Sequence, residues 1–127
     1  MDIGLGITNK IMIMVTDNDT AEALGSGSVN VFATPKMITL MEKASALLVS
    51  PYLQENETTV GTKVNIEHVV PTPVGMEVTI YSRLIGVDNR KLTFEVEAYD
   101  TYDKIGIGTH ERFVVDTKKF MQKTYKK

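Results

Sequence analysis

The chain has 127 residues, of which 43% are hydrophobic and 24% charged, and its formal net charge is −2. This composition is typical of one soluble globular domain over residues 1–127, and it gives no reason to expect nucleic acid or an anionic membrane as a partner. The lack of cysteine excludes disulfides, a thiolate zinc site and a cysteine nucleophile. Neither a signal-peptide pattern nor a run of about 18 apolar residues occurs, so a cytoplasmic location is expected.

The first part of the chain predicts a strand, a break and a loop. Residues 10–16 are mostly apolar and are expected to form a strand, which the polar run 17–20 ends. Residues 21–30 are centred on two Gly-Ser pairs and predict a flexible loop near the functional site, with room for one short helical turn. An interdomain linker is excluded there, because too little chain precedes it to make a domain.

A long helix is predicted over residues 34–50. Thr34 suits the N-cap, and Pro35 suits the first helical position, where no backbone N–H is needed. Pro51 marks the expected end. The segment is apolar almost all the way round, so the helix is expected to be buried on most sides.

Glu42 lies in this helix away from the side where a charge is comfortable. At about 100° per residue, Lys36 and Lys43 share one stripe, whereas Glu42 falls beside Ile38 and Ala46. One interpretation is a helix-surface glutamate that tilts into water or pairs with a lysine. The other is a catalytic role, because an unpaired carboxylate among apolar groups is costly and usually has a partner or a task.

The rest of the chain predicts four strands and a polar tail. In the first strand the even-numbered positions, His68 among them, are expected to share one face. Gly106 and Gly108 share a face of the last strand, where absent side chains permit a bend or the close approach of a neighbour. The expected strands are residues 58–70, 76–87, 92–98 and 105–115, and residues 118–127 are expected to be a solvated, fraying end.

One strand, one buried helix and a meander of antiparallel strands indicate an α+β fold in which the sheet wraps around the helix. This order is the pattern of the hotdog fold. Such a sheet leaves apolar outer surface and strand edges that need cover, so a homodimer is expected, with pairing into a tetramer as a further option.

His68 and Thr34 are candidate partners of Glu42. His68 shares its strand face with Val64 and Ile66, and there it is either a hydrogen-bonded core residue or a base whose tautomer a carboxylate fixes. Thr34 is either only a helix cap or part of a helix N-terminus whose free N–H groups hold an oxyanion. Thr34 and Glu42 lie about 12 Å apart along a straight helix, so an imidazole bridges them only if the glutamate leans toward the N-terminus.

Other motifs are incomplete. Residues 4–9 lack the third glycine of a dinucleotide loop, and residues 25–28 do not place a serine between a strand and a helix. The stretch from His110 to Val114 lacks the second histidine of a zincin, so no metal site is expected and His110 is expected to be structural or exposed.

The sequence resembles the fluoroacetyl-coenzyme A thioesterase family of hotdog proteins over about residues 31–122. The last of the matching stretches and the spacing between the threonine and the glutamate are the more specific. The stretches are Val31-Phe32-Ala33-Thr34, Leu40-Met41-Glu42, Pro51-Tyr52-Leu53, Val60-Gly61-Thr62, His68, Thr72-Pro73-Val74-Gly75 and Gly106-Ile107-Gly108-Thr109-His110-Glu111-Arg112.

The resemblance implies a dimer that hydrolyses an acyl-CoA thioester at its subunit interface. The family's catalytic residues match Thr34, Glu42 and His68, with Thr34 as the nucleophile or as the orienter of a water. No cofactor is expected, since CoA is part of the substrate.

The resemblance also suggests residues for substrate binding. Gly61 matches a glycine near the thioester carbonyl, Arg112 matches an arginine near the site, and Phe32 is assigned with them. Arg90 and Lys91, together with Arg112, are candidate contacts for the CoA phosphates, which would make binding weaken with salt.

The segment before Thr34 bears on the acyl group of the substrate. No aromatic residue precedes Phe32, and the Gly-Ser segment before Thr34 has no bulky side chain to sort small acyl groups, so a short- or medium-chain acyl-CoA is expected as substrate.

Two alternatives stand beside hydrolysis. A hotdog dimer that binds acyl-CoA without turnover, as a sensor or carrier, is the first alternative. An enoyl-CoA hydratase is the second, but it would need an aspartate with its histidine, and none lies close to His68 in the sequence.

Overall fold

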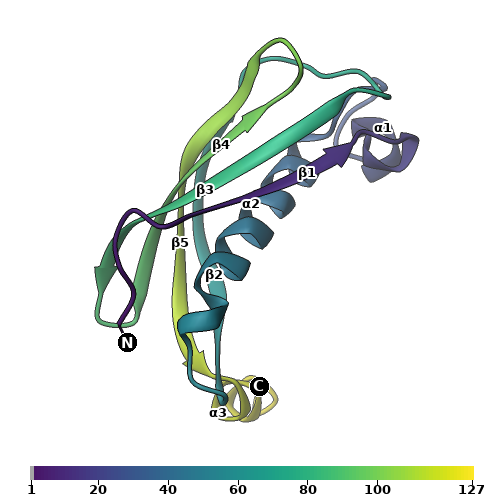
Figure 1. Ribbon diagram of the computed structural model, residues 1–127. Coiled ribbons are helices and arrows are strands. Elements are labelled where there is room, and N and C mark those ends of the chain that lie inside the picture. The colour runs from purple at the N-terminus through teal and green to yellow at the C-terminus, as the bar shows by residue number, and fades with distance from the viewer. Residues whose placement is uncertain (1) are drawn as a thin grey trace.

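A computed structural model describes residues 2–127 as a five-stranded antiparallel sheet that curves around one long helix (Figure 1). The sheet order is β1-β3-β4-β5-β2, so β1 and β2 form its edges. This confirms the expected α+β order of strand, helix and antiparallel meander. The elements are β1 (Thr8–Met14), η1 (Asp17–Asp19), α1 (Ala21–Leu24), α2 (Thr34–Val49), η2 (Ser50–Tyr52), β2 (Glu57–His68), β3 (Glu77–Asp88), β4 (Lys91–Tyr99), β5 (Lys104–Asp116) and α3 (Thr117–Thr124).

The helix α2 forms the centre of the core. Its buried side chains recur at helical spacing and pack onto the concave face of the sheet, where the inward side chains of β3 and β4 are fully buried. It ends where expected, because Pro51 lies in the 3₁₀ turn η2 that follows it. The buried helix residues are Met37, Leu40, Met41, Ala44, Ser45, Leu48 and Val49, and the sheet residues are Val78, Ile80, Leu84, Leu92, Phe94 and Val96.

The N-cap of α2 is Ala33, not Thr34. Ala33 has extended backbone angles (φ −76°, ψ 138°), and no side chain caps this helix end. The entering chain is held by backbone bonds instead: the Phe32 N–H donates to the Thr72 carbonyl at 2.9 Å, and the Ala33 N–H donates to the Asp19 carbonyl at 2.9 Å. The predicted cap was therefore wrong by one residue, and the Thr34 hydroxyl is left for another contact.

A β-bulge changes which side chains of β2 face the helix. The pairing of β2 with β5 shifts between Gly61 and Lys63, which makes Thr62 an extra residue on this strand. Thr59 is consequently buried, and Gly61 lies against a side chain of α2, on the same side as His68. The expected alternation placed Thr59 and Gly61 on the opposite face from His68 and was wrong, because one inserted residue reverses the parity of a strand.

The C-terminal segment is a helix and not a fraying end. The carboxylate of Asp116 caps α3 by accepting from the Lys119 N–H at 3.0 Å, and the Thr117 N–H donates to the Asn56 carbonyl at 2.9 Å. All residues of α3 remain exposed, at the end of the molecule away from α1 (Figure 1). Among residues 2–127, every helix is too short or too polar to cross a membrane.

Candidate active site

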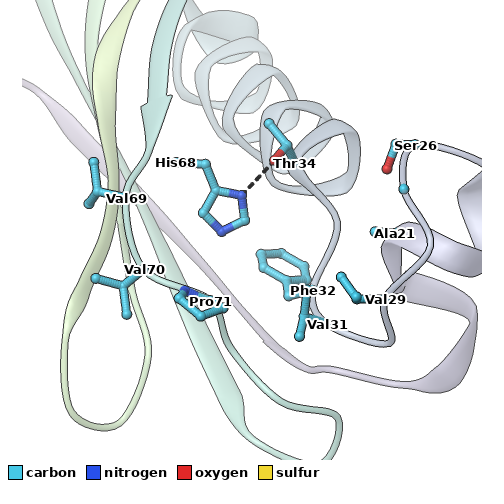
Figure 2. Close-up of a pocket in the computed structure, with 11 residues that line it drawn as sticks. Ala21, Ser26, Val29, Val31, Phe32, Thr34, His68, Val69, Val70 and Pro71 are labelled. Carbon is cyan, nitrogen blue, oxygen red and sulfur yellow. Dashed lines mark hydrogen bonds between the residues drawn. The ribbon is translucent and has the colours of Figure 1, made fainter.

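A hydrogen bond joins Thr34 to His68. Thr34 Oγ1 lies 2.7 Å from His68 Nδ1, and Figure 2 shows the two side chains pointing toward one another. They meet because α2 begins at Thr34 and β2 ends at His68, and the bond from Phe32 to Thr72 ties the two chain segments together. The buried Phe32 ring and the imidazole pack edge to face, with ring centroids 6.2 Å apart and planes at 74°.

The surroundings of His68 favour the neutral imidazole. Burial lowers the pKa of His68 from its ordinary value of 6.5, and the backbone of Val70 opposes this shift. When the Thr34 hydroxyl donates to Nδ1, the imidazole hydrogen is on Nε2. Nε2 is buried and has no hydrogen-bond partner within residues 2–127. His68 is therefore suited to accept a proton at Nδ1 near neutral pH.

A cavity of about 350 Å³ opens beside this pair. One wall is the segment that follows His68, and the opposite wall is the loop after α1, whose side chains there are small (Figure 2). The loop was expected to contain one short helical turn, and α1 confirms this. Residues 22–30 of the loop are exposed. The lining residues are Ala21, Ser26, Gly27, Val29, Val31, Phe32, Thr34, His68, Val69, Val70 and Pro71.

Glu42 has an arginine as its partner. Glu42 Oε2 lies 3.7 Å from Nη1 of Arg112, with the side chain of Glu42 40% exposed and that of Arg112 10% exposed. A Cβ atom at Gly61 would lie only 2.6 Å from the same carboxylate oxygen. The carboxylate therefore occupies the space that any larger residue at position 61 would fill, and the structure brings Glu42, Arg112 and Gly61 together.

Arg112 is held by three further contacts. Its Nε donates to Thr59 Oγ1 at 2.8 Å, its Nη2 donates to the Thr59 carbonyl at 3.0 Å, and its Nη1 lies 3.2 Å from His110 Nε2. This buried guanidinium is unsuited to a CoA phosphate, contrary to one of the expectations from the sequence. His110 was expected to be either structural or exposed. It is 1% exposed, so it is a buried structural residue.

Glu42 and His68 do not meet within one chain. No hydrogen bond or ion pair joins them anywhere in residues 2–127. Gly61, which touches Glu42, precedes His68 by seven positions in β2, about 20 Å along a strand. The expected bridge from Glu42 to the imidazole is therefore absent inside the chain, and the polar residues form two separate centres.

Arg90 lies in a groove at the other end of β2. Its Nη2 donates to Glu57 Oε2 at 2.7 Å, and its Nε donates to the Val114 carbonyl at 3.0 Å. Lys119 and Lys123 of α3 line the same groove, whereas Lys91 is not among its lining residues. The two lysines were missed because the tail was expected to fray. The signal for this helix is Asp116 itself, because aspartate is a preferred N-cap residue whose carboxylate accepts from the backbone N–H three positions later.

Thr59 and His110 were also missed as members of the site. The signal for Thr59 is Gly61, because a glycine inside a strand pattern often marks a bulge and hence a change of face. His110 precedes Arg112 by two positions in β5, so the two side chains share a strand face.

Comparison with solved structures defines the class of the protein. The structure of the fluoroacetyl-CoA thioesterase FlK superposes with a TM-score of 0.94 at 34% identity, covering 100% of this chain and 98% of that chain. A thioesterase superfamily member of Thermus thermophilus superposes with a TM-score of 0.92 at 28% identity, covering 98% and 93%. The fold is that of the hotdog thioester hydrolases.

Comparison of sequences gives the family. The family described as fluoroacetyl-CoA-specific thioesterase matches residues 15–118. The fluoroacetyl-CoA thioesterase of Streptantibioticus cattleyicolor is 42% identical over 97 residues, which cover 76% of this chain and 70% of the relative. The chain belongs to the fluoroacetyl-CoA-specific thioesterase family.

Proposed function

We propose that the protein hydrolyses a short- or medium-chain acyl-CoA thioester to the free acid and CoA, at a site formed between two copies of the chain. The observation that carries this proposal is the hydrogen bond between Thr34 and His68, both of which line a cavity with mostly apolar side chains. Family membership makes a thioester hydrolase the class of enzyme, and the catalytic and binding roles of individual residues are part of the proposal.

The chemistry begins with proton removal by His68. Its Nδ1 takes the hydroxyl proton of Thr34, or that of a water which Thr34 orients, and the oxygen adds to the thioester carbonyl carbon. The C–S bond then breaks, and the proton held on the imidazole passes to the CoA sulfur. If Thr34 attacked, water cleaves the resulting ester with His68 again as the base. If Thr34 only orients water, the acid forms directly.

The N-terminus of α2 is suited to hold the developing oxyanion. The first intrahelical donor is Met37, whose N–H bonds the Ala33 carbonyl at 3.0 Å. Pro35 has no N–H, so Thr34 and Lys36 supply the backbone donors that precede this bond. Donors fixed before the reaction stabilise negative charge that develops in the transition state.

The cavity favours acyl groups that are not limited to two carbons. Its walls carry valine, alanine and proline side chains, and the loop wall offers only Ser26, Gly27 and Val29. Apolar walls bind alkyl groups by burying their surface, and small residues leave room for additional carbons. These features support a short- or medium-chain substrate.

A second copy would complete the site. β2 is an edge strand, so its outer backbone groups are available to another strand, and Val64 on its helix side is 44% exposed. Two β2 strands that pair antiparallel about a twofold axis near residues 64 and 65 would bring Gly61 of one copy beside His68 of the other. Glu42 of the partner subunit would then approach His68 Nε2, which is buried and unpartnered in the described chain.

The CoA phosphates would bind along the same strand. The groove with Arg90, Lys119 and Lys123 lies beyond Gly61 toward the start of β2, and Lys91 follows Arg90 in the chain. Cationic side chains there would attract phosphates in a salt-dependent manner.

Thiol release from a panel of acyl-CoA thioesters, read with a thiol reagent, tests the activity. We expect turnover with acetyl-CoA and with longer acyl groups such as butyryl-CoA and hexanoyl-CoA. Saturable binding without thiol release would instead indicate a sensor or carrier.

Mixed dimers test the shared site. His68→Ala and Glu42→Gln chains, each strongly impaired alone but still measurable, are unfolded together and refolded to exchange subunits. If each site takes His68 from one copy and Glu42 from the other, one intact site forms per mixed dimer, and about a quarter of wild-type activity returns. A mixture no more active than its components would show that the site is not shared, and self-mixed samples of each variant are the controls.

A further inference from the structure

His110 lies where no substrate can reach it, yet it contacts the polar centre around Glu42. It is 1% exposed, and its ring stacks on Phe94 with centroids 6.1 Å apart and planes at 29°. In the sheet, His110 of β5 pairs with Val64 of β2, and it shares its strand face with Arg112. The reaction proposed above uses neither nitrogen of this imidazole.

The two hydrogen-bond partners of His110 select a single tautomer. Nδ1 lies 2.8 Å from the Lys63 carbonyl, which can only accept, so Nδ1 carries the hydrogen. Nε2 lies 3.2 Å from Nη1 of Arg112, which can only donate, so Nε2 carries the lone pair. An imidazolium would place an N–H against the guanidinium N–H. His110 is therefore neutral and accepts from Arg112.

The charges around His110 agree with the neutral form. Burial lowers the pKa of His110 from its ordinary value of 6.5, and Arg112 lowers it further. The Lys63 carbonyl, Glu42 and Glu111 act in the opposite direction without reversing the shift. The acceptor for Arg112 thus persists at pH values where an exposed histidine would begin to be protonated.

The orientation of Arg112 depends on Thr59 and His110. Thr59 accepts from Nε and Nη2, which fixes one edge of the guanidinium plane, and His110 accepts from Nη1 on the other edge. Nη1 is also the atom nearest to Glu42 Oε2, at 3.7 Å. The nitrogen that faces Glu42 is therefore the one that His110 holds.

We propose that His110 is a positioning residue for the active site, which acts through Arg112 to hold the carboxylate of Glu42 against Gly61. The inference rests on the proposed function, in which Glu42 supports catalysis. Because His110 does not touch the substrate, its effect should appear in the turnover number and not in the Michaelis constant.

Two substitutions separate the contact to Arg112 from the packing of the ring. In His110→Gln the side-chain oxygen can reach the position of Nε2 and accept from Arg112, whereas the shorter side chain of His110→Asn retains only a donor near Lys63. Both lose the stack on Phe94, so their losses of stability should be similar. We expect kcat to fall roughly tenfold in His110→Asn, as for the loss of a hydrogen bond to a charged group, and by no more than about threefold in His110→Gln.

The same substitutions in a Glu42→Gln background test the route through Arg112. If His110 acts on Glu42, His110→Asn should cause no further loss of kcat once Glu42→Gln has removed the charge. An undiminished tenfold loss in that background, or equal kcat for the Asn and Gln variants, would overturn the inference. If Glu42→Gln alone left kcat unchanged, the proposed site would fail and this inference with it.

A measurement on the unmodified protein covers the case in which His110→Asn does not fold. The ¹⁵N chemical shifts of the His110 ring identify which nitrogen carries the hydrogen. We expect the Nδ1-protonated neutral tautomer throughout the pH range of activity. An Nε2-protonated ring or an imidazolium at pH 7 would overturn the inference, since neither can accept from Arg112.

Discussion

The carboxylate of Glu42 lies against the bare Cα of Gly61, in the space where a Cβ atom would approach Oε2 to 2.6 Å. Gly61→Ala should therefore displace the carboxylate and lower kcat by roughly 10- to 100-fold, because a small misplacement of a catalytic group is costly. Some stability should also be lost, because the Cβ atom would lie 3.2 Å from Arg112 Nη1 and 3.3 Å from the buried ring of His110, and both would have to shift by a few tenths of an ångström. Turnover and melting temperature of one preparation check both parts.

Gly86→Ala is the matched control for this substitution. Gly86 also lies next to a strand irregularity, in β3, but a Cβ there would meet only Thr93 at an ordinary 3.5 Å. We expect near-normal turnover for Gly86→Ala. Equal losses in the two variants would mean that the effect at Gly61 is a general one on strand backbone.

Thr34→Val should separate catalysis from helix stability. The Thr34 hydroxyl bonds His68 and caps nothing, so its removal should change the free energy of unfolding by no more than about 0.5 kcal/mol. Turnover should fall roughly 100-fold, because the proton donor to the base is gone. Thr39→Val on the same helix, whose hydroxyl bonds the Pro35 carbonyl, serves as the control and should retain activity. A cap-like loss of about 1 kcal/mol with normal turnover would refute the assignment.

His68→Ala should lower kcat by roughly 10² to 10⁴, the usual contribution of general base catalysis. The Michaelis constant should change little, because the contacts to the acyl group and to CoA remain. A folded variant with near-normal turnover would exclude His68 as the base and leave it as a core residue whose loss costs only stability.

The acidic limb of the pH profile should report the carboxylate of the partner subunit. His68 must be neutral to accept a proton; burial lowers its pKa from 6.5 within one chain, whereas Glu42 of the partner subunit would raise it in the proposed dimer. Glu42→Gln should therefore move the acidic midpoint of kcat/KM to lower pH. A midpoint that Glu42→Gln leaves unchanged or raises would contradict the approach of this carboxylate to His68.

Protonation of the histidines should also lower the free energy of unfolding as the pH falls. His68 and His110 both have lowered pKa values, so below pH 6.5 the unfolded chain binds protons that the folded chain does not. The free energy of unfolding should therefore be greatest above pH 6.5 and should decline toward about pH 5, where carboxylates are still ionised. Denaturant titrations of the wild type and His110→Gln check this, with a shallower decline expected for the variant.

Replacing Arg90 and Lys91 together by alanine should raise the Michaelis constant for acyl-CoA at low salt, with a smaller effect at high salt. Turnover should stay near normal because neither residue is close to the thioester. Arg83→Ala is the control, since Arg83 is similarly exposed and also pairs with a glutamate, but lies outside the groove. An unchanged Michaelis constant in the double variant would remove these residues from the phosphate site.

Local patterns were sufficient to predict α2 and the five strands of this fold, although not α3. Pro35 and Pro51 bracket α2 because proline is tolerated in a first helical turn and ends a helix interior, and the strands follow from alternating apolar side chains. The hydrogen bond between Thr34 and His68 agrees with the expectation that these residues share a site. Thr34 lies at the start of α2 and His68 at the end of β2, and an error of one residue in either boundary leaves them at these same ends.

Long-range partners could not be predicted in the same way. Arg112 is 70 positions from Glu42 in the sequence, and only the register of β5 on β2 decides that it faces Gly61. Thr62 in turn controls that register. The neighbouring Gly61 is the one local signal of a bulge, and it does not say which residue is the extra one. The seven positions of β2 between Gly61 and His68 also keep Glu42, which lies against Gly61, too far from His68 for contact inside one chain.

The bulge at Thr62 makes the length of β2 part of the active-site chemistry. Gly61 and His68 are an odd number of positions apart, so in a regular strand their side chains would face opposite ways. The extra residue Thr62 reverses the alternation, and both positions therefore face the helix. Deleting or inserting one residue between them would turn one of the two away from the helix, whereas a change of two would preserve the facing. Among relatives and designed variants, gaps of even length in this segment should therefore be compatible with hydrolysis, and gaps of odd length should be found in proteins that have lost it.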